Sequence, residues 1–266
     1  MSRLNALGYA DYSQFESAAL AEELLSGNRV LGRAPDDRIL KYQAMLSLSQ
    51  KLKAATDTLV REFESVQIIP NNMRVMASRL EPTGGPLTTL STNYGAMSTE
   101  ISDWFESNVV GENSIFATIA DNVNSSMFNE TLVGILRQCD TQMNGEREHL
   151  GGIDIEAEHA VLRKIIRDYS ATSKSNTDLI IDESGRIQVA CKTMARHVLG
   201  LSTTRVMCKI ESARMGLSGE GLADIIGQLG RFQEKIGDQL DAIAKMGEEI
   251  QSVARKVLDF QDAKPL

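Results

Sequence analysis

Apolar and small residues recur at alternating spacings of three and four between Tyr42 and Leu80. The positions are Tyr42, Met45, Ser49, Leu52, Thr56, Leu59, Phe63, Val66, Pro70, Met73, Ala77 and Leu80. This spacing is typical of a coiled-coil seam. Gly84, Gly85 and Pro86 interrupt it, and a proline cannot continue a helix. We therefore predict a helical hairpin with its tip near residues 81–87.

The pattern resumes beyond this tip and forms the return arm of the first hairpin. Its positions are Leu87, Leu90, Tyr94, Met97, Ile101 and Trp104, and later Leu132, Val133, Leu136 and Met143. Between these two groups, Gly111 and the polar stretch 122–126 weaken the seam, so we expect a bend or looser packing there. The first hairpin is predicted to span residues 36–145, followed by a glycine-containing connector over 146–158.

A second hairpin is predicted over residues 159–262, with its tip near 214–221. The outward arm has candidate seam positions at Leu162, Ile166, Tyr169, Ser173, Asn176, Ile180, Glu183, Ile187, Ala190, Met194, His197, Leu201, Thr204 and Cys208. The return arm repeats every seven residues as Leu222, Leu229, Ile236, Ile243, Ile250 and Val257, with Ile226, Leu240 and Ala254 between them. This last seam is the most regular in the chain.

The two hairpins resemble each other in sequence. Arg74-Val75-Met76-Ala77 precedes the first tip as Arg205-Val206-Met207-Cys208 precedes the second. A lone hairpin leaves part of its apolar stripe exposed, so we predict an all-α, long antiparallel four-helix coiled-coil bundle made from the two hairpins. Residues 1–35 are expected to add a short accessory helix over 13–25. Whether the hairpins pair within one chain or between chains, as a homo-oligomer, stays open.

Composition narrows the function classes. The net charge of -8 and the pI near 5.1 argue against nucleic acid and anionic membranes as partners. No apolar run approaches the ~20 residues that span a bilayer, and the N-terminus lacks the apolar core of a signal peptide, so a cytoplasmic location is expected. Cys139, Cys191 and Cys208 are too widely separated to indicate a disulfide framework or a zinc site. No cofactor is expected.

Little in the sequence points to an enzyme. His197 falls on a predicted seam position and should face inward, although a histidine phosphotransfer bundle that uses His197 is one alternative. Glu22-Glu23 and Glu248-Glu249 are adjacent acids that point about 100° apart on a helix, so neither pair converges for acid-base chemistry.

The second tip carries a family resemblance. It reads Ile210-Glu211-Ser212-Ala213-Arg214-Met215-Gly216-Leu217-Ser218-Gly219-Glu220-Gly221-Leu222-Ala223. This segment resembles the cytoplasmic signalling hairpin of methyl-accepting chemotaxis receptors, whose tip reads Ile-Glu-Ala-Ala-Arg-Ala-Gly and then Gly-x-Gly-Phe-Ala. The matching residues are Glu211, Ala213, Arg214, Gly216, Gly219, Gly221 and Ala223, and Leu222 replaces the Phe. The first tip looks like an eroded copy that includes Glu81.

The resemblance implies a signalling or scaffold protein whose tip binds a histidine kinase, a coupling protein or receptors. The partner-binding residues that it implies are Glu211, Arg214, Gly219, Gly221, Leu222 and Glu81. The family is also methylated at paired glutamates, which makes Glu22, Glu23, Glu248 and Glu249 candidate methylation sites. Leu217 departs from the family, which has an acidic residue there. The main alternative is a structural coiled-coil spacer or assembly factor in which the tips are only turns.

Overall fold

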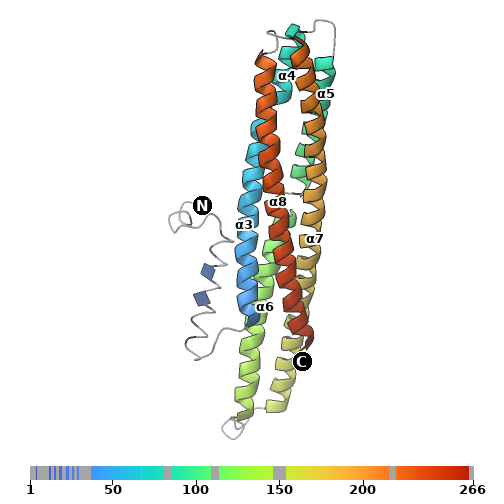
Figure 1. The fold of residues 1–266 in the computed structure, drawn as a ribbon. Coiled ribbons are helices and arrows are strands. Elements are labelled where there is room, and N and C mark those ends of the chain that lie inside the picture. The colour runs from blue at the N-terminus through green and yellow to red at the C-terminus, as the bar shows by residue number, and fades with distance from the viewer. Residues whose placement is uncertain are drawn as a thin grey trace. The chain divides into compact units, whose positions relative to one another are not determined.

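The computed structural model describes most of the chain as helix (Figure 1). The described residues are 37–66, 68–80, 86–108, 114–145, 154–215 and 220–263, together with nine single residues before Asp37. The helices are α3 (Asp37–Val66), α4 (Ile68–Leu80), α5 (Pro86–Asn108), α6 (Ile115–Gly145), α7 (Ile155–Met215) and α8 (Glu220–Ala263). Among these residues there is no strand, which confirms the all-α prediction.

Residues with a polar side chain begin two of the helices. The backbone N–H of Ala117 donates to Ser114 Oγ at 3.2 Å before α6, and that of Ala157 donates to Asp154 Oδ1 at 3.1 Å before α7. Both are N-cap hydrogen bonds, which satisfy a donor that the helix cannot. Pro70 is the third residue of α4, where a missing N–H costs no helical hydrogen bond.

Two compact units make up the chain. Unit 1 contains Met1–Gln50, Thr118–Glu183 and Glu249–Leu266, and unit 2 contains Lys51–Ala117 and Ser184–Glu248. Helices α3, α7 and α8 therefore contribute residues to both units.

Unit 1 packs segments of α3, α6, α7 and α8. Helices α6 and α7 are antiparallel, because Ser125 lies next to Asn176 while Asp140, further along α6, lies next to His159 at the start of α7. Helix α3 lies against the end of α8, where Lys41 Nζ stands 4.6 Å from the ring centre of Phe260.

Unit 2 packs segments of α3, α7 and α8 with α4 and α5. Helices α7 and α8 are antiparallel, since Gly230 lies against Arg205 and Gly247 against Ile187. Helices α4 and α5 pack on each other (Figure 1). Phe63 and Phe232 join α3 to α8 with ring centres 5.9 Å apart. Unit 1 thus packs four helix segments, and unit 2 packs five, because it contains α4 as well as the end of α3.

Burial confirms the described seam positions of α3 and, except for the partly buried Ile226, those of α8. Of the described positions predicted on α5 and α6, only Tyr94, Ile101 and Val133 are buried. Along α8, Leu229, Ile236, Ile243, Ile250 and Val257 are all buried, as are Leu240 and Ala254. On α3, the predicted positions from Tyr42 to Phe63 are buried, and so is Met73 on α4. The seven-residue series of α7 is also correct, with Ile166, Ser173, Ile180, Ile187, Met194, Leu201 and Cys208 buried.

Between residues 176 and 198, the second series on α7 was placed one residue too early, whereas Thr204 of the same series is buried as predicted. The buried residues are Thr177, Ser184, Cys191 and Val198, whereas Asn176, Glu183, Ala190 and His197 are only partly buried. The polar side chains of Asn176 and Glu183 are thus kept out of the fully buried core. Small hydroxyl side chains take their places in the core.

The predicted return arm of the first hairpin is divided into α5 and α6, with 109–113 between them outside the described residues. The polar stretch 122–126, where a bend was expected, lies inside the continuous helix α6. In the predicted accessory helix, residues 15, 18, 19, 22 and 23 are described and helical. The tips near 81–85 and 216–219 and the connector residues 146–153 lie outside the described residues, and α7 already includes 155–158.

Structural equivalence supports an internal duplication with an offset of 131 residues. This offset separates Arg74 from Arg205 in the paired sequence motifs. It also relates buried positions throughout the helices, for example Phe63 with Met194, Ile101 with Phe232, Ile119 with Ile250, and Val123 with Ala254. The same offset holds before and after residues 109–113. The two hairpins therefore align without an insertion between α5 and α6.

Candidate protein-binding site and buried polar cluster

The structure brings together two of the predicted partner-binding residues at the end of α7. Arg214 lies in the last turn, and its Nη1 stands 3.1 Å from Glu211 Oε1. The Arg214 side chain is 72% exposed, whereas that of Glu211 is 14% exposed. An exposed ion pair of this kind adds only about 0–1 kcal/mol to folding stability. The Arg214 guanidinium thus contacts Glu211 while most of its side chain stays accessible.

The other predicted partner-binding residues are placed only in part. Gly221 and Leu222 belong to the first turn of α8. Glu81 and Gly219 lie outside the described residues. The structure thus assembles Glu211 with Arg214 and leaves the rest of the implied tip as a prediction.

Exposed apolar side chains gather on α7 within unit 2. Val189, Leu199, Val206, Met207 and Ile210 are each 48–69% exposed. Val206 and Met207 belong to the repeated Arg-Val-Met motif, and their exposure was not predicted. The seam pattern contained the signal, because Val206 and Ile210 fall between the buried positions of α7.

The same stretch of α7 departs from the acidic character of the chain. Its basic residues are Arg186, Lys192, Arg196, Arg205, Lys209 and Arg214, and its single acidic residue is Glu211. Residues 184–215 thus carry a formal charge of +5, from six basic residues and one acidic residue. The net charge of -8 for the whole chain does not reveal this local excess of positive charge.

His197 is not the inward-facing residue that the predicted seam required. The neighbouring Val198 is buried instead, and the His197 side chain is 28% exposed with Nδ1 3.5 Å from Glu100 Oε2 on α5. A Cβ at Gly200 would lie 2.7 Å from the Met97 side chain, so α5 and α7 approach closely here. His197 lies at the edge of this helix contact.

The candidate methylation sites that the structure describes are exposed. Glu22, Glu23, Glu248 and Glu249 all lie at the surface and in helical conformation. Exposure satisfies the access that a modifying enzyme needs, but it is the ordinary state of a glutamate. It therefore adds no support for methylation.

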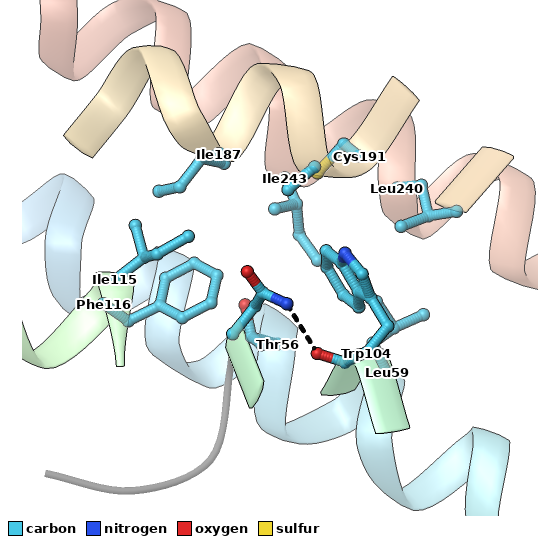
Figure 2. A pocket seen from close by; sticks show the side chains of 11 residues that line it. Thr56, Leu59, Trp104, Ile115, Phe116, Ile187, Cys191, Leu240 and Ile243 are labelled. Atoms are coloured by element: carbon cyan, nitrogen blue, oxygen red, sulfur yellow. Dashed lines mark hydrogen bonds between the residues drawn. The ribbon is translucent and has the colours of Figure 1, made fainter. Parts of the chain in front are cut away.

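A small apolar cavity lies in unit 2 beside the end of α5 (Figure 2). Trp104, Phe116, Ile187 and Cys191 contribute to its walls, and Asn108 Nδ2 donates to Trp104 O at 2.9 Å. Its volume is ≈ 10 Å³. A single water needs about 10–15 Å³, whereas ligand pockets measure hundreds of Å³. This cavity is a packing defect and not a ligand site.

Burial makes two of the three thiols unreactive. It raises the pKa of Cys191 to about 12, with a smaller contribution from the negative charge of Asp241. It raises the pKa of Cys208 to about 11. Because the thiolate is the reactive form, neither residue is suited to nucleophilic chemistry at neutral pH.

A buried polar cluster in unit 1 joins all four helices. At its centre is the Glu130 carboxylate of α6, whose side chain is 4% exposed. Its Oε1 accepts hydrogen bonds from Ser173 Oγ at 3.1 Å and from Gln261 Nε2 at 2.8 Å, and Arg38 Nη1 lies 2.8 Å from Oε2. Buried charge is tolerated only with such compensation. The cluster was not predicted, because its members are far apart in sequence.

Tyr42 extends the cluster on α3. Its hydroxyl lies 2.9 Å from Thr177 Oγ1 and 3.3 Å from Ser173 Oγ. Burial is the main reason why the pKa of Tyr42 is raised, and the Ser173 and Thr177 hydroxyls oppose that effect. The hydroxyl therefore stays protonated and can donate a hydrogen bond.

Two contacts in the cluster join equivalent residues of the duplication. Tyr42 contacts Ser173, and Gln261 contacts Glu130, each across 131 residues. Residues that meet their own equivalents lie close to the local axis that relates the two copies. Here each pair has diverged in sequence, so the centre of unit 1 is chemically asymmetric.

Comparison with known proteins identifies no relative. No protein-family model matches the chain, and no curated protein and no solved structure matches it either. Among the described residues, no three histidine, cysteine or acidic side chains are grouped so that they could hold a metal ion. Within the same residues, every helix is too short or too polar to span a bilayer.

Proposed function

We propose that this chain is a cytoplasmic, chemoreceptor-like signalling or scaffold protein. The end of its second hairpin binds a chemotaxis-type histidine kinase or coupling protein. The observation that carries the proposal is Arg214, which is 72% exposed in the last turn of α7 and paired with Glu211. These are two of the residues that resemble the receptor tip. The antiparallel arrangement of α7 and α8 supplies the hairpin that this tip requires.

The proposal is tested by retention of a purified coupling protein, or of the receptor-associated kinase, on the immobilised chain. Arg214→Ala and Glu211→Ala should each reduce retention strongly, because Arg214 supplies the charge and Glu211 orients it. Arg163→Ala is the matched control, since Arg163 is an exposed arginine in unit 1 of the same helix. Equal retention of all four proteins would remove the tip from the mechanism.

The structural spacer makes the opposite prediction. Arg214→Ala would then be silent, and only the packing of the helices would matter. Leu229→Asn would lower stability under either function, because an unpaired buried polar group costs about 1–3 kcal/mol. Retention and thermal melting of the same variants therefore separate binding from structure.

A phosphotransfer function is a second candidate because His197 is partly exposed. Its Nδ1 lies 3.5 Å from Glu100 Oε2. Incubation with a purified kinase and labelled ATP tests this candidate. Labelling of the wild type that His197→Gln abolishes would support it, and absence of labelling would exclude it.

A further inference from the structure

One side of α7 combines exposed apolar and basic residues. We define the α7 face as Lys192, Arg196, Leu199, Val206 and Ile210, which follow one another at helical spacings of four, three, seven and four. Leu199, Val206 and Ile210 are 69%, 51% and 50% exposed, and Lys192 and Arg196 are exposed as well. The opposite side of the helix is buried in unit 2 through Leu201 and Cys208.

The exposed apolar residues of α7 have exposed equivalents in the first copy of the duplication. Counting back 131 residues from Leu199 and Val206 leads to Ile68 and Val75 on α4. These two are also exposed, at 60% and 51%. A single exposed apolar residue needs no explanation. The same pair is exposed at equivalent positions of both copies, so its exposure is a recurring feature of the repeat.

The two equivalent surfaces differ in charge. Residues 184–215 carry +5, whereas the equivalent residues 53–84 carry four basic and four acidic residues and are neutral. The basic excess is therefore specific to α7. Since the whole chain carries -8, the residues outside 184–215 together carry -13.

We propose that the α7 face docks an acidic protein surface that also exposes apolar side chains. Electrostatic complementarity favours an acidic partner, and the apolar residues supply the contact area. Pairing of two α7 faces would bring like charges together, which disfavours a second copy at this site. An anionic membrane fits less well, because residues 184–215 contain no Phe, Tyr or Trp to anchor in the interface. The proposal concerns the side of α7 and does not depend on the proposed function.

The test measures binding of two fluorescent helical peptides to the full chain, one repeating glutamate and leucine and the other lysine and leucine. The wild type should bind the acidic peptide at least about tenfold more tightly, and this affinity should fall as NaCl rises from about 0.05 to 0.3 M. Circular dichroism shows that each variant is folded.

The duplicated pairs provide matched variants. Leu199→Ser with Val206→Ser should weaken binding of the acidic peptide about tenfold, whereas Ile68→Ser with Val75→Ser should change it less than about twofold. Lys192→Glu with Arg196→Glu should also weaken it, and Arg163→Glu with Lys164→Glu on the same helix should not. The proposal is overturned by equal affinity for both peptides or by equal effects of the α4 and α7 pairs. It is equally overturned if the chain binds anionic vesicles but not the acidic peptide.

Discussion

Glu130 is a buried acidic residue at the centre of the polar cluster in unit 1. A carboxylate withdrawn from water loses hydration, and its partners must replace that hydration. Ser173 and Gln261 supply two hydrogen bonds, and Arg38 supplies a positive charge at 2.8 Å. Arg38 is itself 24% exposed at the start of α3, so a residue near the surface stabilises a charge in the core.

Arg38→Ala should therefore destabilise the protein more than is usual for a partly exposed arginine, because it leaves the Glu130 charge buried without its partner. Breaking a buried ion pair from one side costs about 3–5 kcal/mol, and the partial exposure of Arg38 places the expected loss near the lower end, about 3 kcal/mol. Urea unfolding followed by circular dichroism gives the free energy of unfolding.

The double variant Arg38→Ala with Glu130→Gln is the control for this prediction. It removes both charges and keeps the hydrogen-bonding shape of the side chain, so it should be more stable than Arg38→Ala alone. A double variant that loses the sum of the two single effects would show that the ion pair contributes nothing.

The thiols provide a second prediction for single residues. At pH 8 a thiol reagent should modify Cys139, which is partly exposed, and reach Cys191 and Cys208 only after denaturation. Burial raises the pKa of Cys191 from 9.0 to about 12 and that of Cys208 from 9.0 to about 11. The stability linked to these protonated thiols is therefore fully present below pH 9.0 and is lost as the pH rises through the two raised pKa values. Modification of all three thiols at one rate in the native protein would contradict the described burial.

The helices show where sequence patterns are sufficient and where they are not. On α8, leucine and isoleucine at every seventh position define the buried side without ambiguity, and the prediction is confirmed from Leu229 to Val257. On α7, the second core series contains Thr177 and Ser184, which are as polar as their neighbours Asn176 and Glu183. Hydrophobicity alone does not show which of two neighbouring polar residues is buried, and for this reason the predicted series is shifted by one residue.

The bend expected in the first return arm rested on two sequence signals. Gly111, whose helix propensity is low, lies in residues 109–113, outside the described residues. The asparagines and serines of 122–126 have similarly low helix propensity, yet α6 is continuous there because Val123, Ser126 and Met127 are buried in unit 1. Tertiary packing overrides local propensity in this segment.

The assigned face of α7 leads to a prediction for two leucines on one helix. Leu201 is 1% exposed and Leu199 is 69% exposed. Leu201→Ala should reduce the free energy of unfolding by about 2–5 kcal/mol, because it leaves a cavity in the core. Leu199→Ala should change it by less than about 0.5 kcal/mol. Comparable losses in the two urea titrations would mean that α7 is rotated relative to the described structure.

At the scale of the whole molecule, duplication within one chain permits asymmetry that two identical subunits cannot have. Equivalent positions 130 and 261 hold Glu and Gln, and the Gln261 amide donates to the Glu130 carboxylate at 2.8 Å. In a symmetric pair both positions would hold the same residue, and two carboxylates would repel each other. Sequence comparison of the two halves detects the repeat through Arg74-Val75-Met76 but does not reveal which diverged positions meet in space.

Gln261→Glu restores the symmetric pair and should destabilise unit 1 at neutral pH. Two carboxylates at this distance raise the pKa of one of them above its unfolded value, so the lost stability should return as pH falls and that group binds a proton. Thermal melting at pH 7 and pH 5 measures the effect, and adding Glu130→Gln to the variant should remove the pH dependence. A Gln261→Glu protein with wild-type stability at pH 7 would show that the two positions do not meet.

The candidate site at the tip was predicted only through the family resemblance. Glu211 and Arg214 were assigned from the motif, and the structure places them in contact. The apolar and basic side of α7 could not be predicted from the sequence, because its prediction requires knowing which residues the bundle leaves exposed.

Hydrogen–deuterium exchange of the chain with and without a purified coupling protein tests directly whether α7 near its C-terminal end binds a chemotaxis-type partner. We expect slower exchange in residues 196–215 when the coupling protein is present and no change in residues 155–183 of the same helix. Unchanged exchange throughout α7, or protection confined to residues 155–183, would contradict this expectation.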